Sequence, residues 1–277
     1  MKNKIWFITG ISSGLGKALA QSVMEKDDFV IGTFRNQDQV DNFNKNHQKN
    51  GFAILLDITN QKEIENSVEM IISKYGKIDI LVNNAGIGFV GAVEETTMDE
   101  VRKVFEVNLF AAIKLTQTVL PYMRKKKHGH IIQISSHGGI KAFAGFGIYN
   151  ASKFALEGFS EAMAQEVSSL GIKVSIVEPG PFRTNFAGNG LGIAKNVIED
   201  YAKTAGAFRT KIQSVDGKQE GDPIKASKAI INLVNSNNTS LRLPLGKTAL
   251  ITIKMKLNSV QSDLETNKEI AKNTVYK

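Results

Sequence analysis

The chain has 277 residues, which is enough for one α/β domain with a large core. Its apolar content of 42% and charged content of 22% are ordinary for a soluble globular protein. It contains no cysteine, which excludes disulfides, thiolate metal sites and cysteine nucleophiles, and we expect no bound metal. The formal net charge is +8, so nucleic-acid binding has to be considered.

The positive charge is scattered along the chain, apart from one dense run at residues 124–127. This run follows a long helical pattern, and cations complement the negative end of a helix dipole. We therefore interpret it as a solvated helix end and expect no nucleic-acid partner. No apolar run is long enough to span a bilayer, and the first strand begins too early to leave room for a signal peptide. We expect a cytoplasmic protein that does not contact a membrane.

The first element is a short apolar run at residues 5–8, which predicts a buried parallel strand. The turn that follows reads Thr9, Gly10, Ile11, Ser12, Ser13, Gly14, Leu15 and Gly16. A helical pattern begins after it. Strand, glycine-rich turn and helix form the context of a dinucleotide-binding site, because glycines let the backbone approach a pyrophosphate and the helix N-terminus attracts it. For this motif alone, a glycine-rich turn without a ligand is a serious alternative.

The end of the second predicted strand bears on the choice of cofactor. An acidic residue here would hydrogen-bond an adenosine 2′-OH, whereas an arginine accommodates a 2′-phosphate. The chain has Phe34 followed by Arg35, and a guanidinium pairs well with phosphate. We therefore predict NADP(H) in preference to NAD(H). The alternative is that Arg35 is only a surface cation that caps a helix.

Further along the chain, apolar strands alternate with amphipathic helices, the pattern of a doubly wound parallel sheet. Strands are predicted at 5–9, 29–33, 53–56, 78–82, 130–135, 173–178 and 241–244, and helices at 14–26, 61–75, 98–124, 149–170 and 223–235. The fold class is therefore a Rossmann-type α/β domain of about seven strands that spans residues 1–277. In such sheets ligands bind at the carboxyl ends of the strands. The candidate functional positions lie at or just after the ends of the predicted strands: Gly10, Asp57, Asn83, Ser135, Ser136 and Pro179.

Tyr149 and Lys153 lie four residues apart on a predicted helix and therefore on one face. An ammonium beside a phenol favours the phenolate, so we predict that the pKa of Tyr149 falls from roughly 10 toward neutral. Tyr149 then becomes a candidate general acid/base, and the Ser136 hydroxyl would hold a carbonyl oxygen in place. Such a pair occurs by chance on many helices, so its meaning depends on the other motifs.

Taken together, these motifs resemble the short-chain dehydrogenase/reductase family, in the order in which that family carries them. The matching residues are the turn from Thr9 to Gly16, Asn83-Asn84-Ala85-Gly86, Asn108, Ser136, Tyr149 with Lys153, and Pro179-Gly180-Pro181-Phe182-Arg183-Thr184. The resemblance covers residues 4–184 well and the remainder weakly. It points to bacterial, NADP-preferring members similar to carbonyl reductases and alcohol dehydrogenases.

The resemblance implies a role for each matching residue. Tyr149 would be the acid/base, Ser136 would bind the substrate oxygen, Lys153 would also hold the nicotinamide ribose, and Asn108 would organise a proton-relaying water. The implied cofactor contacts are Thr9, Gly10, Ser12, Ser13, Gly14, Leu15, Gly16, Arg35, Asp57, Ile58, Asn83, Ala85, Gly86, Tyr149, Lys153, Pro179, Gly180 and Thr184. Asp57 is also a candidate N-terminal cap for the following helix, and both roles are compatible. A homodimer or homotetramer built on the helices at 98–124 and 149–170 is implied as well.

The substrate is expected to be a small carbonyl compound or alcohol of hydrophobic character. Its candidate contacts are Ser136, Phe143, Phe146, Tyr149, Phe182 and Phe186, and the same aromatic residues would equally form the packed core of a lid. Residues 181–222 are predicted to be a substrate lid, because this stretch contains several glycines. Residues 246–277 are predicted to form a helical tail that packs on the domain or on a partner subunit.

Two other functional classes remain open at this point. A non-redox enzyme on the same scaffold, such as an epimerase, dehydratase or dehalogenase, would keep much of the motif set. A lyase that no longer uses nicotinamide is disfavoured by the intact cofactor loop and by Pro179-Gly180. A non-catalytic NADPH-sensing protein is disfavoured because Tyr149 and Lys153 are both present.

Overall fold

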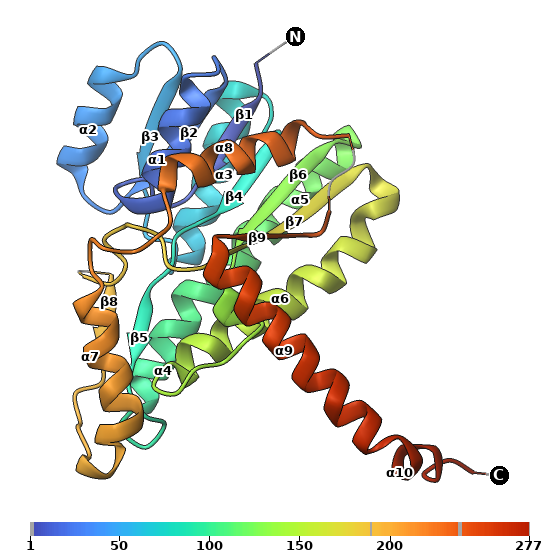
Figure 1. Ribbon diagram of the computed structural model, residues 1–277. Helices are drawn as coiled ribbons and strands as arrows, with labels where there is room; N and C mark the ends of the chain where they lie inside the picture. The colour runs from blue at the N-terminus through green and yellow to red at the C-terminus, as the bar shows by residue number, and fades with distance from the viewer. Residues whose placement is uncertain (1–2, 189, 238–239, 277) are drawn as a thin grey trace.

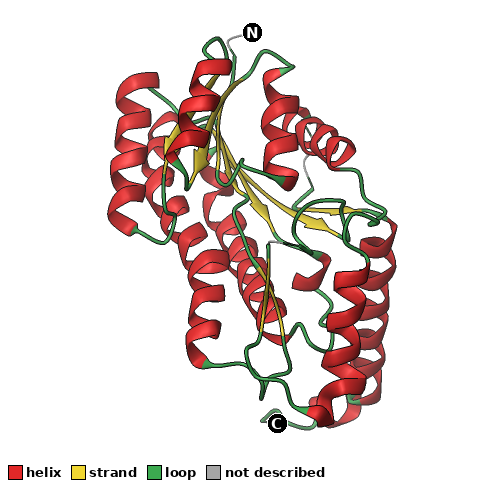
Figure 2. Cartoon of the chain, turned by 90° about the vertical axis from the view of Figure 1, so that its left-hand side faces the viewer, coloured by secondary structure: helices red, strands yellow, loops and turns green. Residues whose placement is uncertain are grey.

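The computed structural model describes residues 3–188, 190–237 and 240–276. At its centre is a seven-stranded parallel sheet in the order β3-β2-β1-β4-β6-β7-β9, with helices on both faces (Figures 1 and 2). Its strands are β1 (Ile5–Ile8), β2 (Phe29–Phe34), β3 (Gly51–Leu55), β4 (Ile80–Asn83), β6 (Gly129–Ile134), β7 (Ile172–Pro179) and β9 (Arg242–Leu245). The doubly wound parallel fold predicted from the sequence is confirmed.

The two faces of the sheet carry separate cores, because side chains alternate along each strand. Ile5 and Phe7 of β1 belong to one core, and Trp6 and Ile8 belong to the other. The first core packs against α3 (Gln61–Tyr75), α5 (Ala111–Lys126) and α6 (Gly147–Val167), and the second against α1 (Gly14–Met24), α2 (Gln37–Asn46) and α8 (Pro223–Asn235). Strands buried on both faces explain the continuous apolar runs in the sequence.

The order of the strands reverses direction between β1 and β4. From β1 the chain builds outward through β2 and β3, and from β4 it builds outward the other way through β6, β7 and β9. The loops that follow β1 and β4 therefore leave the sheet side by side and open a crevice at its carboxyl edge. This topology brings the predicted site segments together.

The long helix predicted over residues 98–124 is interrupted in the structure. It consists of α4 (Met98–Phe105), a π-helical turn (Glu106–Phe110) and α5. Single π turns inside helices widen the backbone locally and are frequent at functional sites. The sequence also did not predict α2, where Val40 and Phe43 alone are buried, nor the short strands β5 (Gly88–Val90) and β8 (Leu191–Ile193).

Residues 181–222 leave the domain and return to it at one point. Phe182 forms a β-bridge with Gly221, where Arg183 N donates to Gly221 O at 2.9 Å and Gly221 N donates to Pro181 O at 3.0 Å. Between these ends, β8 pairs in parallel with β5, and α7 (Ala207–Ser214) follows. The two ends of the segment are thus hydrogen-bonded to each other, and β8 attaches the segment to the body.

A buried ion pair also fastens this segment to the body. Glu95 is 1% exposed and pairs with Arg209 Nη2 at 2.7 Å. Its carboxylate also accepts from Ile198 N at 3.0 Å and from Ala92 N at 2.8 Å. Burial works to raise the pKa of Glu95, but these donors and Arg209 outweigh it and hold the pKa below its usual range.

The tail consists of α9 (Lys247–Thr266) and α10 (Lys268–Lys272), which project from the domain (Figure 1). Its first turns contact the body, because Ala249 is buried and Thr252 Oγ1 hydrogen-bonds His137 Nδ1 at 2.9 Å. From Leu257 onward the described tail residues are exposed. No helix in the described ranges combines the length and apolarity needed to cross a membrane.

Replacing Glu95 by Gln is expected to loosen the 181–222 segment, because Arg209 loses the charge that compensates its burial. We expect a fall in Tm of about 5 °C and faster proteolysis within 181–222. Differential scanning fluorimetry and limited trypsin digestion would measure both effects. Glu69→Gln on α3 is the matched control, because Glu69 is exposed and no described hydrogen bond or ion pair joins it to the 181–222 segment. Equal digestion of both variants and the wild type would contradict a fastening role.

Candidate active site

The turn after β1 can be formed only by glycine at three positions. Gly10 and Gly14 have φ angles of +68° and +59°, in the left-handed region that side chains disfavour. A Cβ at Gly16 would overlap the carbonyl oxygen of Gly10 and the side chain of Asn84. The backbone therefore folds tightly at the start of α1.

The segment after β4 is hydrogen-bonded to this turn. Thr9 Oγ1 accepts from Asn84 N and from Ala85 N, both at 3.0 Å. Asn84 Nδ2 donates to Thr9 O at 2.8 Å and to Gly10 O at 3.0 Å. Asn83 differs from the rest, since it is buried and its Nδ2 donates to Thr116 Oγ1 of α5 at 3.1 Å. Asn84, rather than Asn83, is the asparagine that ties the two loops together.

The N-terminus of α1 fits a pyrophosphate. Ser13 occupies the N-cap position without a side-chain capping bond, and the first turn contains no acidic residue. Backbone N–H groups and the positive end of the helix dipole are therefore available to an anion. Thr184 lies against the same turn, because a Cβ on Gly14 would be 3.3 Å from Thr184 Cβ. Gly180 is held by a hydrogen bond from its N to Leu245 O at 2.8 Å.

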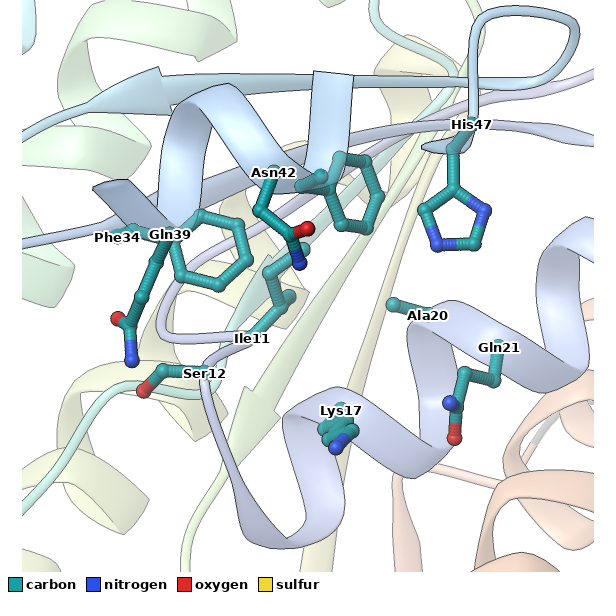
Figure 3. A pocket seen from close by; sticks show the side chains of 10 residues that line it. Ile11, Ser12, Lys17, Ala20, Gln21, Phe34, Gln39, Asn42 and His47 are labelled. Carbon is teal, nitrogen blue, oxygen red and sulfur yellow. The ribbon is translucent and has the colours of Figure 1, made fainter. Parts of the chain in front are cut away.

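A cavity of about 340 Å³ lies beside the turn, between α1 and α2. Figure 3 shows Ser12 and Lys17 on one side of it and Gln39 and Asn42 on the other. Phe34, at the end of β2, contributes to its wall and is buried. None of the described residues that line this cavity is a carboxylate, and one of them, Lys17, is a cation.

Arg35 follows Phe34 and is exposed. It does not cap α2, because Asn36 is the N-cap and accepts from Gln39 N at 3.1 Å. The interpretation of Arg35 as a helix cap is therefore wrong, and among the described residues its guanidinium makes no hydrogen bond or ion pair. The exposed side chain is therefore available to a ligand.

Asp57 follows β3 and does not cap α3 either. Its Oδ1 accepts from Thr59 N at 2.9 Å and from Thr59 Oγ1 at 2.8 Å, and Asn60 is the residue that caps the helix. The interpretation of Asp57 as the helix cap is wrong because its carboxylate closes a local turn three residues earlier. The neighbouring Ile58 is buried.

Tyr149 and Lys153 lie on the buried face of α6, each 5% exposed. Lys153 Nζ donates to Ile134 O, at the end of β6, at 2.9 Å. Ser136 follows the same strand, and its Oγ accepts from Gly138 N at 2.9 Å and donates to Pro179 O at 3.5 Å. The three predicted catalytic side chains therefore meet at the carboxyl end of β6.

The expected direction of the Tyr149 pKa is wrong. Burial raises the pKa of Tyr149 to about 12, and a hydrogen bond with Ser136 only partly opposes the rise. Burial also lowers the pKa of Lys153 to about 8, against the opposing charge of Glu157. The phenol is therefore protonated at neutral pH and suited to donate a proton, because burial disfavours the phenolate.

Asn108 lies on the π-helical turn and is bound to the backbone of Ile87. Its Oδ1 accepts from Ile87 N at 2.8 Å, and its Nδ2 donates to Ile87 O at 2.9 Å. Gly86 brings Asn108 and Lys153 into one neighbourhood, because a Cβ there would lie 3.2 Å from Asn108 Oδ1 and 3.5 Å from Lys153 Nζ. Both amide atoms of Asn108 are thus bonded to the backbone, as in an asparagine with a structural role.

Aromatic rings surround the Tyr149 phenol. Its ring centroid lies 4.9 Å from that of Phe146 and 5.6 Å from that of Phe186. Phe143 joins the same cluster through Phe208 of α7. Phe182 does not, because it packs against Gly221 at the base of the 181–222 segment. The structure thus brings three of the four predicted phenylalanines together.

Two buried polar residues near the site were not identified from the sequence. Asn150 Nδ2 donates to Gly138 O at 2.7 Å, and its Oδ1 accepts from Phe143 N at 3.0 Å. Asn150 thereby orients the loop that carries Ser136 and Phe143. Glu157 is 4% exposed one turn beyond Lys153. The position of Glu157 four residues after Lys153 was the available sequence signal, but spacing does not show whether the carboxylate is buried.

The chain matches the family model for short chain dehydrogenases over residues 4–191 and belongs to this family. It is 37% identical to oxidoreductase BOA17 of Botryotinia fuckeliana, over 89% of this chain and 90% of that one. It is 39% identical to 3-ketodihydrosphingosine reductase of Bacteroides thetaiotaomicron, over 89% of each chain. A short-chain dehydrogenase structure from Streptomyces avermitilis superposes with a TM-score of 0.93 at 40% identity, covering 99% of both chains. The protein is therefore an NAD(P)-dependent oxidoreductase of the short-chain type.

More distant structures of the same fold hold either nicotinamide cofactor. ElxO contains NADP and superposes with a TM-score of 0.73 at 26% identity, over 90% of this chain and 99% of that one. A structure from Burkholderia phymatum contains NAD, with a TM-score of 0.82 at 19% identity, over 94% of this chain and 95% of that one. The fold thus accommodates NADP or NAD, so the preference between the two cofactors depends on the individual residues of each protein.

Replacing Gly16 by Ala is expected to displace the turn after β1, because the new methyl group overlaps the Gly10 carbonyl. Overpacking of this kind would weaken NADPH binding roughly tenfold or more. The change in NADPH fluorescence on titration with protein measures the affinity. Gly158→Ala on α6 is the control, since a Cβ there meets no atom within 4 Å. Unchanged affinity in Gly16→Ala would show that the turn does not hold the dinucleotide.

Proposed function

We propose that the protein transfers hydride between NADP(H) and a hydrophobic ketone, aldehyde or secondary alcohol, with Tyr149 as the general acid/base. The observation that carries this proposal is the meeting of Ser136, Tyr149 and Lys153 at the carboxyl end of β6. A protonated, buried phenol next to a hydroxyl is suited to a carbonyl oxygen. The adjacent glycine turn and α1 N-terminus offer the place for a dinucleotide.

In the proposed reduction, a nicotinamide held at this site would supply the hydride for the carbonyl carbon. Tyr149 donates its proton to the carbonyl oxygen, on which negative charge accumulates. Ser136 Oγ donates a hydrogen bond to the same oxygen, which stabilises that charge. Lys153 stabilises the phenolate that remains on Tyr149 after the proton has left, and holds the ribose. In oxidation the same groups act in reverse, with Tyr149 accepting the proton.

The preference for NADP(H) is supported by the residues at the end of β2. Phe34 takes the place of an acid that would bind a 2′-OH, and Arg35 is exposed without a partner in the described ranges. Lys17 at the nearby cavity adds a second positive charge. Arg35 would pair with the 2′-phosphate and, together with Lys17, compensate its negative charge. Asp57 and Ile58 would contact the adenine, and Thr184 the nicotinamide half.

The hydrophobic substrate class is supported by the rings of Phe143, Phe146 and Phe186 around the phenol. Apolar walls with few polar groups select apolar ligands. A ketone of the kind named for the Bacteroides thetaiotaomicron relative fits this class. Residues 181–222 would act as a lid, because Phe186 contacts Tyr149 from that segment. Phe182 would then act at the hinge instead of in the substrate wall.

We further propose that the protein is a cytoplasmic homodimer or homotetramer. Exposed apolar side chains support an interface on the helices around α5 and α6: Met98 at the start of α4, Phe110 before α5 and Phe154 on α6. Apolar surface of this kind is typical of interfaces between subunits.

Replacing Tyr149 by Phe is expected to lower kcat by about a hundredfold or more, because the proton donor is lost while the ring contacts remain. NADPH consumption with a panel of ketones and aldehydes, followed at the absorbance of the reduced nicotinamide, measures this. Tyr122→Phe on α5 is the control. Wild-type turnover in Tyr149→Phe would refute the mechanism, and tight NADPH binding without turnover of any compound by the wild type would favour a sensing protein.

Replacing Arg35 by Ala is expected to weaken NADPH binding by roughly tenfold or more while leaving NADH binding nearly unchanged, because only NADPH carries the 2′-phosphate. Parallel fluorescence titrations with both nucleotides measure the difference. Arg124→Ala removes one surface cation at a helix end and controls for net charge. Equal losses for the two nucleotides would refute the assigned role of Arg35.

A further inference from the structure

A group of charged side chains, two of them buried carboxylates, lies near Lys153. Glu157 follows Lys153 by one turn of α6, and Glu178 lies on β7; both are nearly inaccessible to solvent. Arg242 of β9 is the cation that they share, with Nε 3.4 Å from Glu157 Oε2 and 3.2 Å from Glu178 Oε1. Its Nη2 reaches the exposed Glu161 at 2.9 Å. None of these groups has a part in the hydride transfer described above.

Lys153 and Glu157 lie near consecutive residues at the end of β6. Lys153 Nζ donates to Ile134 O at 2.9 Å, and a Cβ on Gly139 would touch both Ser135 Oγ and the Glu157 side chain. Neither carboxylate oxygen of Glu157 has a well-formed hydrogen bond within the described residues. A buried carboxylate without such bonds depends on neighbouring cations for its compensation. The cations that face Glu157 are Lys153 and Arg242.

We propose that Glu157 is a positioning residue whose carboxylate keeps Lys153 in the ammonium form, and that Arg242 on β9 keeps this carboxylate ionised. The last strand of the sheet is thereby coupled to the reacting centre through the ion pair of Arg242 with Glu157 and through the charge of Glu157 one helical turn from Lys153. This inference rests on the proposed function, in which Lys153 has to be positively charged.

The protonation of the cluster agrees with this assignment. Burial raises the pKa of Glu157, and the Ser135 hydroxyl, Arg242 and Lys153 oppose the rise. Burial and the charge of Glu157 together raise the pKa of Glu178 to about 7, against Arg242. One arginine cannot fully compensate two buried carboxylates, so Glu157 and Glu178 compete for the charge of Arg242.

The remaining groups around Glu157 are Glu161 on α6 and Lys256 on α9. Both line, with Glu157 and Arg242, a groove of about 440 Å³ between α6 and α9. The groove gives water access to the outer side of the cluster. Both carboxylate oxygens of Glu157 are themselves buried.

The test is the titration of Lys153 in the full-length protein without cofactor, followed by NMR of ¹³Cε-labelled lysines. Its signal is assigned by its loss in Lys153→Arg. In Glu157→Gln we expect Lys153 to lose its proton about one pH unit lower than in the wild type, because a negative charge near the ammonium is gone. Equal midpoints in the two proteins would overturn the proposal.

Two further variants separate charge from shape. Glu157→Asp keeps the charge but not the length, and Glu157→Gln keeps the length but not the charge. A midpoint in the Asp variant closer to wild type than that of the Gln variant supports an electrostatic role; the reverse order overturns it. Glu161→Gln is the matched control, since Glu161 touches the same arginine but lies two turns from Lys153. In Glu161→Gln the midpoint of the Lys153 titration is expected to stay at the wild-type value.

The rate of ketone reduction is expected to fall at high pH, and the pH at which it falls should follow the same order among the variants as the Lys153 midpoint. A protein that turns over no ketone would contradict the proposed function, whereas the NMR titration still decides the role of Glu157. If Glu157→Gln does not fold, Arg242→Gln replaces it. There the two buried carboxylates lose their shared cation and take up protons, so the Lys153 midpoint again falls; an unchanged midpoint overturns the proposal.

Discussion

The close approach of the turn after β1 to the segment after β4 is the constraint on which the site depends. Thr9 and Asn84 bind each other's backbone across the switch point of the sheet. The contact is possible because Gly16 has no side chain at the place where the Gly10 carbonyl lies. It fixes the N-terminus of α1 against the loop that leads to Ile87. Since Ile87 in turn holds Asn108, the glycine turn and the π-helical turn form one connected unit.

Burial is the second physical factor, and it governs the chemistry of the reacting groups. Tyr149 is enclosed by aromatic rings, some from the body and some from residues 181–222. The same enclosure that excludes water from a hydride transfer also raises the cost of a phenolate. Lys153 is subject to the opposite cost, because burial disfavours its ammonium form. A buried carboxylate one turn away offsets that cost, which gives Glu157 a reason to lie inside the protein.

Much of the fold was predictable because parallel strands and amphipathic helices leave strong local patterns. The seven strands were each expected within a few residues of their observed limits. The meeting of Ser136, Tyr149 and Lys153 was predictable too, since two of them share a helix face and the third follows a strand of the same sheet. Helix α2 was not, because only Val40 and Phe43 of it are buried and its pattern is correspondingly weak.

The sequence alone determined the fold class and the position of the glycine turn, because these depend on local periodicity and spacing, and its resemblance to the family supplied the candidate catalytic set. Only the tertiary structure decided which way the pKa of Tyr149 moves, since desolvation depends on residues far away in the chain. It likewise separated Phe182 from the other phenylalanines and gave Asn60, instead of Asp57, the role of helix cap. It also joined Glu157 to Arg242 of β9, because contacts between residues so distant in sequence follow from the packing of the sheet and not from any local pattern.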